Sequence, residues 1–309
     1  MRLRFVSLLA ALGLVSSGMT GGALAQDVGT LEPKPLPPLA HPEDPLTPAK
    51  ELFGRKAEPA PLAARTIGFY SHGCLAGGRP LPVNGPAWEV MRLSRNRNWG
   101  HPALIAFLER FARKVPTVSN WPGILVGDMS QPRGGPMLTG HASHQIGLDA
   151  DIWLTPMPNR DLSRLEREEM SAVNVVRGDR LDVDPTRWTP DHLAVVKAAA
   201  LDPEVQRIFV NAAIKKAICR EATGDRSWLN KVRPYYGHDY HFHVRLACPQ
   251  GEEACRDQDP VPPGQGCDAS LAWWFSESIL HPTPGPWKPR RPLTMAQLPT
   301  ECKTVLLAR

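Results

Sequence analysis

Two short stretches of the sequence gather half of its ten histidines beside aspartates. They are Gly140-His141-Ala142-Ser143-His144-Gln145-Ile146-Gly147-Leu148-Asp149-Ala150-Asp151 and Gly237-His238-Asp239-Tyr240-His241-Phe242-His243. Residues 241–246 alternate in polarity, which predicts a strand. On a strand His241 and His243 project to the same face, whereas a helix would separate them by about 200°. Residues 149–154 follow a glycine-containing loop and predict a second strand, so the fold is built on a sheet with polar side chains on one face.

The residue types in these stretches are those of a catalytic zinc site, which uses three His, Asp or Glu ligands and leaves one position for water. The second stretch supplies two imidazoles together, and the first can complete the site from a neighbouring strand and loop. Simpler interpretations exist. A lone His-x-His is common on a polar strand face, and His141 is favoured as a cap or supporting residue. Asp149 and Asp151 can be simple loop acids or part of a calcium-type site, although too few oxygen ligands gather nearby for calcium. Taken jointly, the two stretches favour metal binding over coincidence.

Composition and the remaining motifs exclude several other classes of protein. The sequence contains no His-Glu-x-x-His, no nucleophile elbow, no Walker loop and no Ser-x-x-Lys. The formal net charge of +5, from 36 Lys and Arg against 31 Asp and Glu, is small and scattered, so no nucleic-acid partner is expected. Thirty-three prolines argue against coiled coils and helical bundles.

The N-terminal residues 1–25 have the pattern of a cleavable signal peptide. Arg2 and Arg4 precede an apolar run over residues 5–15, and Ala23-Leu24-Ala25 is a good cleavage site. The apolar run is too short to span a bilayer, and no later stretch approaches the required length. We therefore expect an exported protein with no stable membrane insertion after cleavage.

The cysteines form an even set in a protein expected to reach an oxidising compartment, so three disulfides are predicted. Six cysteines allow 15 connectivities, and composition does not choose among them. A zinc finger is not expected, because the sequence has no Cys-x-x-Cys pair. The cysteines are Cys74, Cys219, Cys248, Cys255, Cys267 and Cys302.

The positions of prolines and the spacing of apolar residues predict how the remaining chain is divided into domains, helices and strands. Residues 26–64 predict a proline-rich arm or linker, and residues 65–309 a single domain that ends in a proline-rich tail. Apolar spacing predicts helices over residues 101–115, 190–200 and 203–220, and strands over residues 123–126, 149–154 and 241–246. The expected class is α+β, with a central antiparallel sheet that carries the zinc site, flanked by helices and long loops stapled by disulfides.

Four segments identify a family resemblance. They are Gly73-Cys74-Leu75-Ala76-Gly77, MRLSRNRNWGHP from Met91, VGDMSQPRGGPMLTGHASHQIGLDADIW from Val126, and GHDYHFHVRLACP from Gly237. Together they closely resemble the penicillin-insensitive murein endopeptidases, over roughly Arg65 to Cys302. These are exported zinc peptidases of the wider group that includes lysostaphin-type and D-Ala-D-Ala dipeptidase enzymes.

The resemblance implies roles for individual residues. The family pattern His-x-x-Gly-x-x-x-Asp falls on His144, Gly147 and Asp151, and the terminal His-x-His falls on His241 and His243. It implies that His144, Asp151 and His243 bind Zn²⁺, that His241 and His238 are catalytic, and that His141 is a further candidate for contact with the metal. It also implies the disulfides Cys74–Cys302, Cys219–Cys267 and Cys248–Cys255.

The implied activity is hydrolysis of D-alanyl–meso-diaminopimelyl cross-links in peptidoglycan, in the periplasm, by metal-activated water. Two alternatives, a D,D-carboxypeptidase and an L,D-endopeptidase, would share the zinc site and differ in the shape of the pocket. A third alternative is a non-catalytic wall-binding module with a structural zinc, which would close the fourth coordination position with a protein ligand. The presence of both His238 and His241 argues against that module, because a structural site needs no spare imidazoles.

Overall fold

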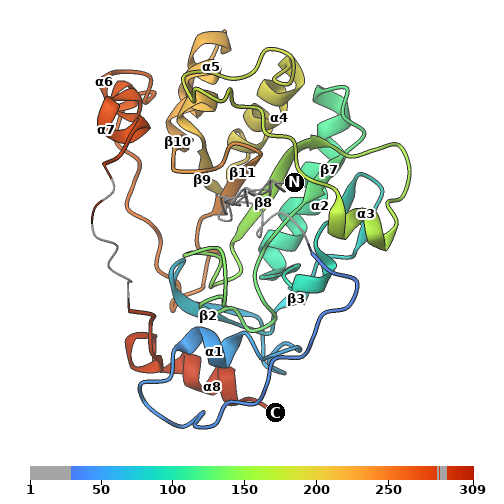
Figure 1. The fold of residues 1–309 in the computed structure, drawn as a ribbon, viewed down its shortest axis with the longest axis vertical. Coiled ribbons are helices and arrows are strands. Elements are labelled where there is room, and N and C mark those ends of the chain that lie inside the picture. The colour runs from blue at the N-terminus through green and yellow to red at the C-terminus, as the bar shows by residue number, and fades with distance from the viewer. Residues whose placement is uncertain (1–28, 284, 286–290) are drawn as a thin grey trace, which may run out of the picture.

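A seven-stranded mixed sheet with the strand order β10-β9-β11-β8-β7-β5-β4 forms the centre of the computed structural model, which describes residues 29–283, 285 and 291–309 (Figure 1). Its strands are β4 (Asn84–Gly85), β5 (Trp88–Val90), β7 (Ile124–Val126), β8 (Asp149–Pro156), β9 (Val205–Val210), β10 (Val232–Pro234) and β11 (His241–Leu246). Two small sheets pair β1 (Arg65–Phe69) with β2 (His72–Ala76), and β3 (Arg79–Pro80) with β6 (Trp99–Gly100). The predicted signal peptide lies outside the described residues, as does part of the predicted tail.

The expectation of an antiparallel sheet is only partly correct, because the sheet is mixed. β11 runs antiparallel to both of its neighbours, β8 and β9, and β8 runs antiparallel to β7. The pairs β5–β7 and β9–β10 are parallel, and β4 pairs antiparallel with β5 at one edge. Parallel neighbours need a crossover connection, and the helices α2 (Pro102–Val118) and α5 (Ala212–Glu221) lie within these two connections.

Most predicted elements are present, and one is wrong. The structure contains a helix or strand at residues 102–118, 190–200, 124–126, 149–156 and 241–246, close to the predicted bounds. The helix predicted over residues 203–220 is instead strand β9 followed by α5. Asn211 separates them, because its side-chain oxygen accepts a hydrogen bond from the Ala213 N–H at 3.0 Å and caps the new helix.

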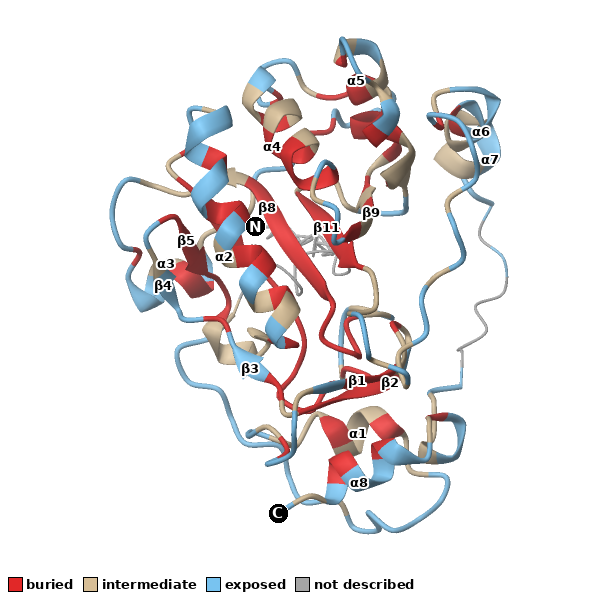
Figure 2. Ribbon diagram, turned by 180° about the vertical axis from the view of Figure 1, so that it is seen from behind, coloured by how far each residue is buried: buried red, intermediate tan, exposed pale blue. Residues whose placement is uncertain are grey.

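Helices cover one face of the sheet and leave the other for polar side chains. In Figure 2, α2 and α4 (Pro190–Ala200) lie beside β8, and their buried side chains share one core with those of β8 and β11. The buried residues Ala150 and Ile152 of β8, and Phe242 and Val244 of β11, belong to this core. The Phe111 ring of α2 meets the Phe242 ring edge-on, with centroids 6.4 Å apart. Burial of these alternate residues fixes the register that turns the intervening ones to the other face.

A second, smaller core lies beside β1 and β2. It joins α1 (Ala49–Phe53), which lies within the predicted proline-rich arm, to the C-terminal helix α8 (Glu301–Leu307). The buried Arg133 guanidinium strengthens this junction, because its Nη1 donates to the carbonyl oxygens of Val305, Leu306 and Ala308 at 2.8–2.9 Å. Carbonyls at the end of a helix have no partner within it, so Arg133 satisfies the last turn of α8.

Three disulfides join Cys74 to Cys302, Cys219 to Cys267 and Cys248 to Cys255. These are the pairs that the family resemblance implies. The first links β2 to α8, the second links α5 to the loop before α6 (Ala269–Ala272), and the third closes the loop after β11. The other helices are α3 (Arg164–Glu169) and α7 (Glu277–Leu280). Within the described ranges, no helix combines the length and apolar character needed to cross a bilayer.

Candidate metal centre

The register of β8 against β11 assembles the polar face of the sheet. His243 lies opposite Asp151, and Arg245 lies opposite Asp149. Residues directly opposite each other in an antiparallel pair share a face, as do residues two apart along one strand. Asp149, Asp151, His241, His243 and Arg245 therefore project together, and all five are buried.

Two loops bring further histidines to this face. The loop before β8 carries His141 and His144, and the loop before β11 carries His238. His144 and His238 have left-handed backbone conformations, with φ of 66° and 54°. Such a φ is uncommon outside glycine. For His144 it is held by a hydrogen bond from its backbone N–H to Asp149 Oδ2 at 2.9 Å.

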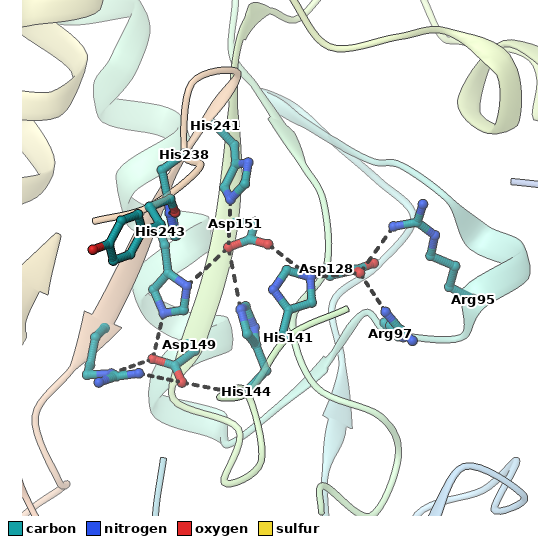
Figure 3. A network of polar contacts seen from close by, with 12 residues as sticks. Arg95, Arg97, Asp128, His141, His144, Asp149, Asp151, His238, His241 and His243 are labelled. Atoms are coloured by element: carbon teal, nitrogen blue, oxygen red, sulfur yellow. Dashed lines mark hydrogen bonds and ion pairs between the residues drawn. The ribbon is translucent and has the colours of Figure 1, made fainter. Parts of the chain in front are cut away.

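Four imidazoles converge on the carboxylate of Asp151 (Figure 3). Its Oδ1 lies 3.3 Å from Nδ1 of His243, 3.4 Å from Nε2 of His144 and 3.6 Å from Nε2 of His241. Its Oδ2 lies 3.4 Å from Nε2 of His141. Ligand atoms that surround zinc tetrahedrally at 2.0–2.1 Å are about 3.3 Å apart, so these separations suit a shared cation.

Several of these atoms are buried without a hydrogen-bond partner among the described residues. They are both ring nitrogens of His144, Oδ1 of Asp151 and Nδ1 of His241. A buried polar atom without a partner costs about 1–3 kcal/mol, and a bound cation would remove that cost for the atoms that ligate it. The ligand atoms of His141, His144 and Asp151 also lie within 4.8 Å of one another. The donor set of imidazole and carboxylate is one that zinc accepts.

The Asp149 carboxylate holds two side chains of the polar face in place. Its Oδ1 accepts hydrogen bonds from His243 Nε2 at 2.9 Å and from Arg245 Nε at 2.8 Å. Because Nε2–H of His243 donates to this carboxylate, the lone pair of the uncharged imidazole is on Nδ1, the nitrogen that faces Asp151. The Arg245 guanidinium is held in turn between the rings of Tyr70 and Phe209, 4.1 and 5.1 Å from their centroids.

A second buried carboxylate, Asp128, positions His141. Its Oδ2 lies 3.1 Å from His141 Nε2, and it also accepts hydrogen bonds from Arg95 and Arg97 at 3.2 and 2.8 Å. Arg97 also donates to the Thr139 carbonyl, in the loop that carries His141. The Asp128 carboxylate, just after β7, thus links the loop that carries His141 to Arg95 and Arg97 (Figure 3).

Burial and neighbouring charges set the protonation of the site in the absence of a cation. Burial, with the nearby imidazoles of His241 and His243, lowers the pKa of His238 to about 3. Burial likewise lowers the pKa of His241. Burial would also lower the pKa of His243, but the Asp149 carboxylate outweighs it and raises that pKa. Burial raises the pKa of Asp151, yet the surrounding imidazoles, His241 foremost, hold it well below its usual value.

A cleft of about 350 Å³ opens onto His141, His238 and His243 of this site. Its walls come from the loops at both ends of the polar face and from β9. The residues that define it are His141, Tyr70, Phe209, Tyr235, His238 and His243. A cleft with aromatic walls and a few convergent polar groups is the usual form of a substrate site.

The chain is similar to known proteins of one family. Residues 66–307 match the penicillin-insensitive murein endopeptidase family. The protein of that name from Haemophilus influenzae is 46% identical over 222 residues, which cover 72% of this chain and 76% of the relative. The Pectobacterium atrosepticum protein of the same name is 42% identical over 247 residues, covering 78% and 87%. An Escherichia coli protein of that name is 42% identical over 249 residues, covering 81% and 88%.

These matches make the chain a metallopeptidase, and its sheet carries imidazoles and carboxylates that could hold a metal ion. It belongs to the penicillin-insensitive murein endopeptidase family.

The structure brings together all six residues singled out from the sequence: His141, His144, Asp151, His238, His241 and His243. Sequence reasoning missed two contributors, Asp128 and Arg245, and left Asp149 as an acid of unspecified role. The alternation of β11 places Arg245 on the face of His243 and was a usable signal. For Asp128 the sequence offered none, because it lies 13 residues from His141 in an irregular segment.

Proposed function

We propose that this protein is a zinc endopeptidase that cleaves D-alanyl–meso-diaminopimelyl cross-links of peptidoglycan in the periplasm. The observation that carries the proposal is the Oδ1 atom of Asp151, buried without a hydrogen-bond partner among the described residues and 3.3–3.4 Å from nitrogens of His243 and His144. The assignment of the substrate rests on the family, whose members named above are murein endopeptidases.

His144, Asp151 and His243 are the proposed zinc ligands. His243 is preferred to His241 because its second nitrogen is bonded to Asp149, which fixes the tautomer that presents Nδ1. His141 is bonded to Asp128 and faces the other oxygen of Asp151, so it supports the site from the side. Zinc, when bound, polarises a carbonyl and lowers the pKa of water towards 7.

His241 and His238 are the proposed groups for proton transfer and for stabilising the developing oxyanion. Their rings are adjacent, with centroids 4.8 Å apart, and His238 lies at the edge of the cleft. His238 Nδ1 is 2.8 Å from the Tyr236 carbonyl, to which it can donate. That bond orients the ring and leaves Nε2 as its free nitrogen. Because burial lowers the pKa of both imidazoles, they are uncharged at neutral pH, and an uncharged imidazole can accept a proton from water and pass it to the leaving amine.

The predicted organisation of the chain fits this role. Residues 1–25 would direct export and be removed, and residues 26–64 would form the arm that precedes the peptidase domain at 65–309. Three disulfides suit an oxidising compartment such as the periplasm.

Digestion of purified sacculi tests the proposal. The mature protein should release muropeptides whose D-alanyl–diaminopimelyl cross-link is broken, identified by mass. Exhaustive chelation should abolish release, and addition of about one zinc per chain should restore it. Full activity in a metal-free preparation would contradict the zinc assignment. Release of terminal D-alanine alone would instead indicate a D,D-carboxypeptidase, and cleavage between diaminopimelyl residues an L,D-endopeptidase.

A further inference from the structure

A series of aromatic rings leads out of the cleft to the surface. It begins at Phe209 on β9 and continues through Tyr235, Tyr236 and Trp274 to Trp273. The centroids of successive rings are 5.7, 6.0, 4.8 and 5.3 Å apart. Tyr235 also lies 5.7 Å from the His238 ring and lines the cleft, so the series is continuous with the candidate active site.

The outer members of this aromatic series are unusually open to solvent. Tyr235, Tyr236 and Trp273 are 51%, 57% and 52% exposed. Large aromatic side chains are mostly buried on average, and contiguous exposed apolar groups mark binding surfaces. Tyrosine and tryptophan combine an apolar face with a polar edge, which suits a ligand that is itself partly apolar and partly hydrated.

The outer half of the series is fixed in place although it lies near the C-terminal tail. Trp273 and Trp274 belong to a short 3₁₀ turn between α6 and α7, beside α5 in Figure 1. The Cys219–Cys267 disulfide ties the preceding loop to α5, and Lys215 donates to the Gln265 carbonyl at 2.7 Å. Such anchoring reduces the entropy lost when a ligand is bound.

We propose that this aromatic series binds the amino-sugar strand of peptidoglycan while the cleft holds the stem peptide. The inference rests on the proposed function. A pyranose ring has an apolar face of C–H groups and a rim of hydroxyl and amide groups. It can stack on Tyr236 or Trp273 while its rim stays in water.

Continuity with the cleft favours this occupant over an unrelated protein. The stem peptides that reach the cleft are covalently attached to the glycan, and an extended peptide of four residues spans at most about 14 Å. Tyr236 and Trp274 are the second and third rings beyond Phe209, at steps of 6.0 and 4.8 Å. A sugar that carries the bound stem is therefore within reach of these rings.

Three measurements on the full mature protein test the inference, using Trp273→Ala and Tyr236→Ala. The first is binding of peptide-free glycan strands, and the other two are kcat/KM on intact sacculi and on a cross-linked peptide dimer without sugar. Each substitution should weaken glycan binding about tenfold. Each should also lower the kcat/KM on sacculi, divided by the kcat/KM on the peptide dimer, by a similar factor. Leu307→Ala, at a 60% exposed position on α8, is the matched control and should change neither quantity.

The outcomes separate this inference from the proposed function. Unchanged glycan binding in both variants, or an unchanged ratio of the two kcat/KM values, would overturn the glycan assignment. A wild-type protein that cleaves neither substrate would overturn the proposed function, while glycan binding would still report on the aromatic series. Thermal melting of each variant establishes that the fold is retained.

Discussion

The carboxylate of Asp149 joins three parts of the chain within one buried site. It accepts hydrogen bonds from the His243 ring on β11, from the Arg245 side chain and from the backbone N–H of His144. Burial alone would raise the pKa of Asp149, but Arg245 and His243 hold that pKa well below its usual value. The residue is therefore an anion that orients two of the proposed ligands at once.

Asp149→Asn tests this orienting role. The amide keeps the volume of the side chain but removes its charge and one acceptor, so His243 loses its fixed tautomer. Zinc affinity should fall about 10–100-fold, measured by competition with a chromophoric chelator. Asp179→Asn, at an exposed residue paired with Arg177, is the control and should leave the affinity unchanged. Equal affinities in Asp149→Asn and the wild type would refute the role.

His241 and His243 lie two residues apart on the same strand and face, yet we expect their replacement to have different effects. His243→Ala removes a proposed ligand, so zinc content and turnover should fall together. His241→Ala leaves the three proposed ligands intact, so it should retain zinc while turnover falls about 10²–10⁴-fold. Metal analysis and muropeptide assays on the same preparations would decide. Loss of zinc in His241→Ala with retention in His243→Ala would reverse the assignments.

Among single residues, the sequence predicts those whose place in the site depends on spacing along one strand. It misses those whose place depends on how two strands are aligned. The alternation from His241 to Leu246 was sufficient to place two imidazoles on one face. The pairing of Arg245 with Asp149 depends instead on how β11 aligns with β8. That alignment is set by burial of Phe242 and Ile152, on the opposite face.

At the scale of elements, the segment from Val205 to Glu221 shows why periodicity misled the prediction. Val205, Ile208 and Val210 are buried in β9. The helix prediction rested on a different set with helical spacing: Val205, Ile208, Phe209, Ala212 and Ala213. Short apolar runs do not distinguish a buried strand from a buried helix. The β-branched residues and the capping Asn211 were the local signals for a strand followed by a new helix.

Lys215, buried within α5, predicts a pH dependence of stability. Burial, with Arg233 and Arg226 nearby, lowers its pKa from 10.5 to about 7. Between these values the unfolded chain binds more protons than the folded one, so the free energy of unfolding should rise as pH increases from about 7 and level off above 10.5. An uncharged amine can still donate to the Leu229 and Gln265 carbonyls.

Lys215→Met removes this titration. Denaturant unfolding from pH 7 to 10 should show the wild type gaining stability relative to the variant as the pH rises. Lys303→Met, at an exposed position on α8, should follow the wild type throughout. Parallel curves for the wild type and Lys215→Met would show that Lys215 titrates normally in the folded protein.

At the scale of the whole molecule, the disulfides close loops of very different length. The paired cysteines are 228, 48 and 7 residues apart in sequence. In the chain-entropy model the longest loop contributes about 5 kcal/mol to the free energy of unfolding and the shortest about 2 kcal/mol. Cys74→Ala/Cys302→Ala should therefore destabilise the protein more than Cys248→Ala/Cys255→Ala in denaturant unfolding. The opposite order would contradict the model, and free thiols in the denatured, unreduced wild type would contradict the pairing.

The overall class was predictable because the strands around the site are local patterns. The mixed character of the sheet was not, because it depends on where the chain returns after α2 and α5. Strands as short as β5 and β10, with three residues each, carry too little periodicity to reveal their direction.

The bridge between Cys74 and Cys302 also imposes an order on biosynthesis. A chain is made from its N-terminus, so Cys74 emerges long before its partner, which lies 228 residues further along the chain. Cys219, Cys248, Cys255 and Cys267 all become available to it first. The thiol must either wait or form a temporary wrong bond that is later exchanged. A protein truncated before Cys302 would be left with an odd thiol, and its maturation should depend on a disulfide isomerase more than that of a protein with consecutive pairs.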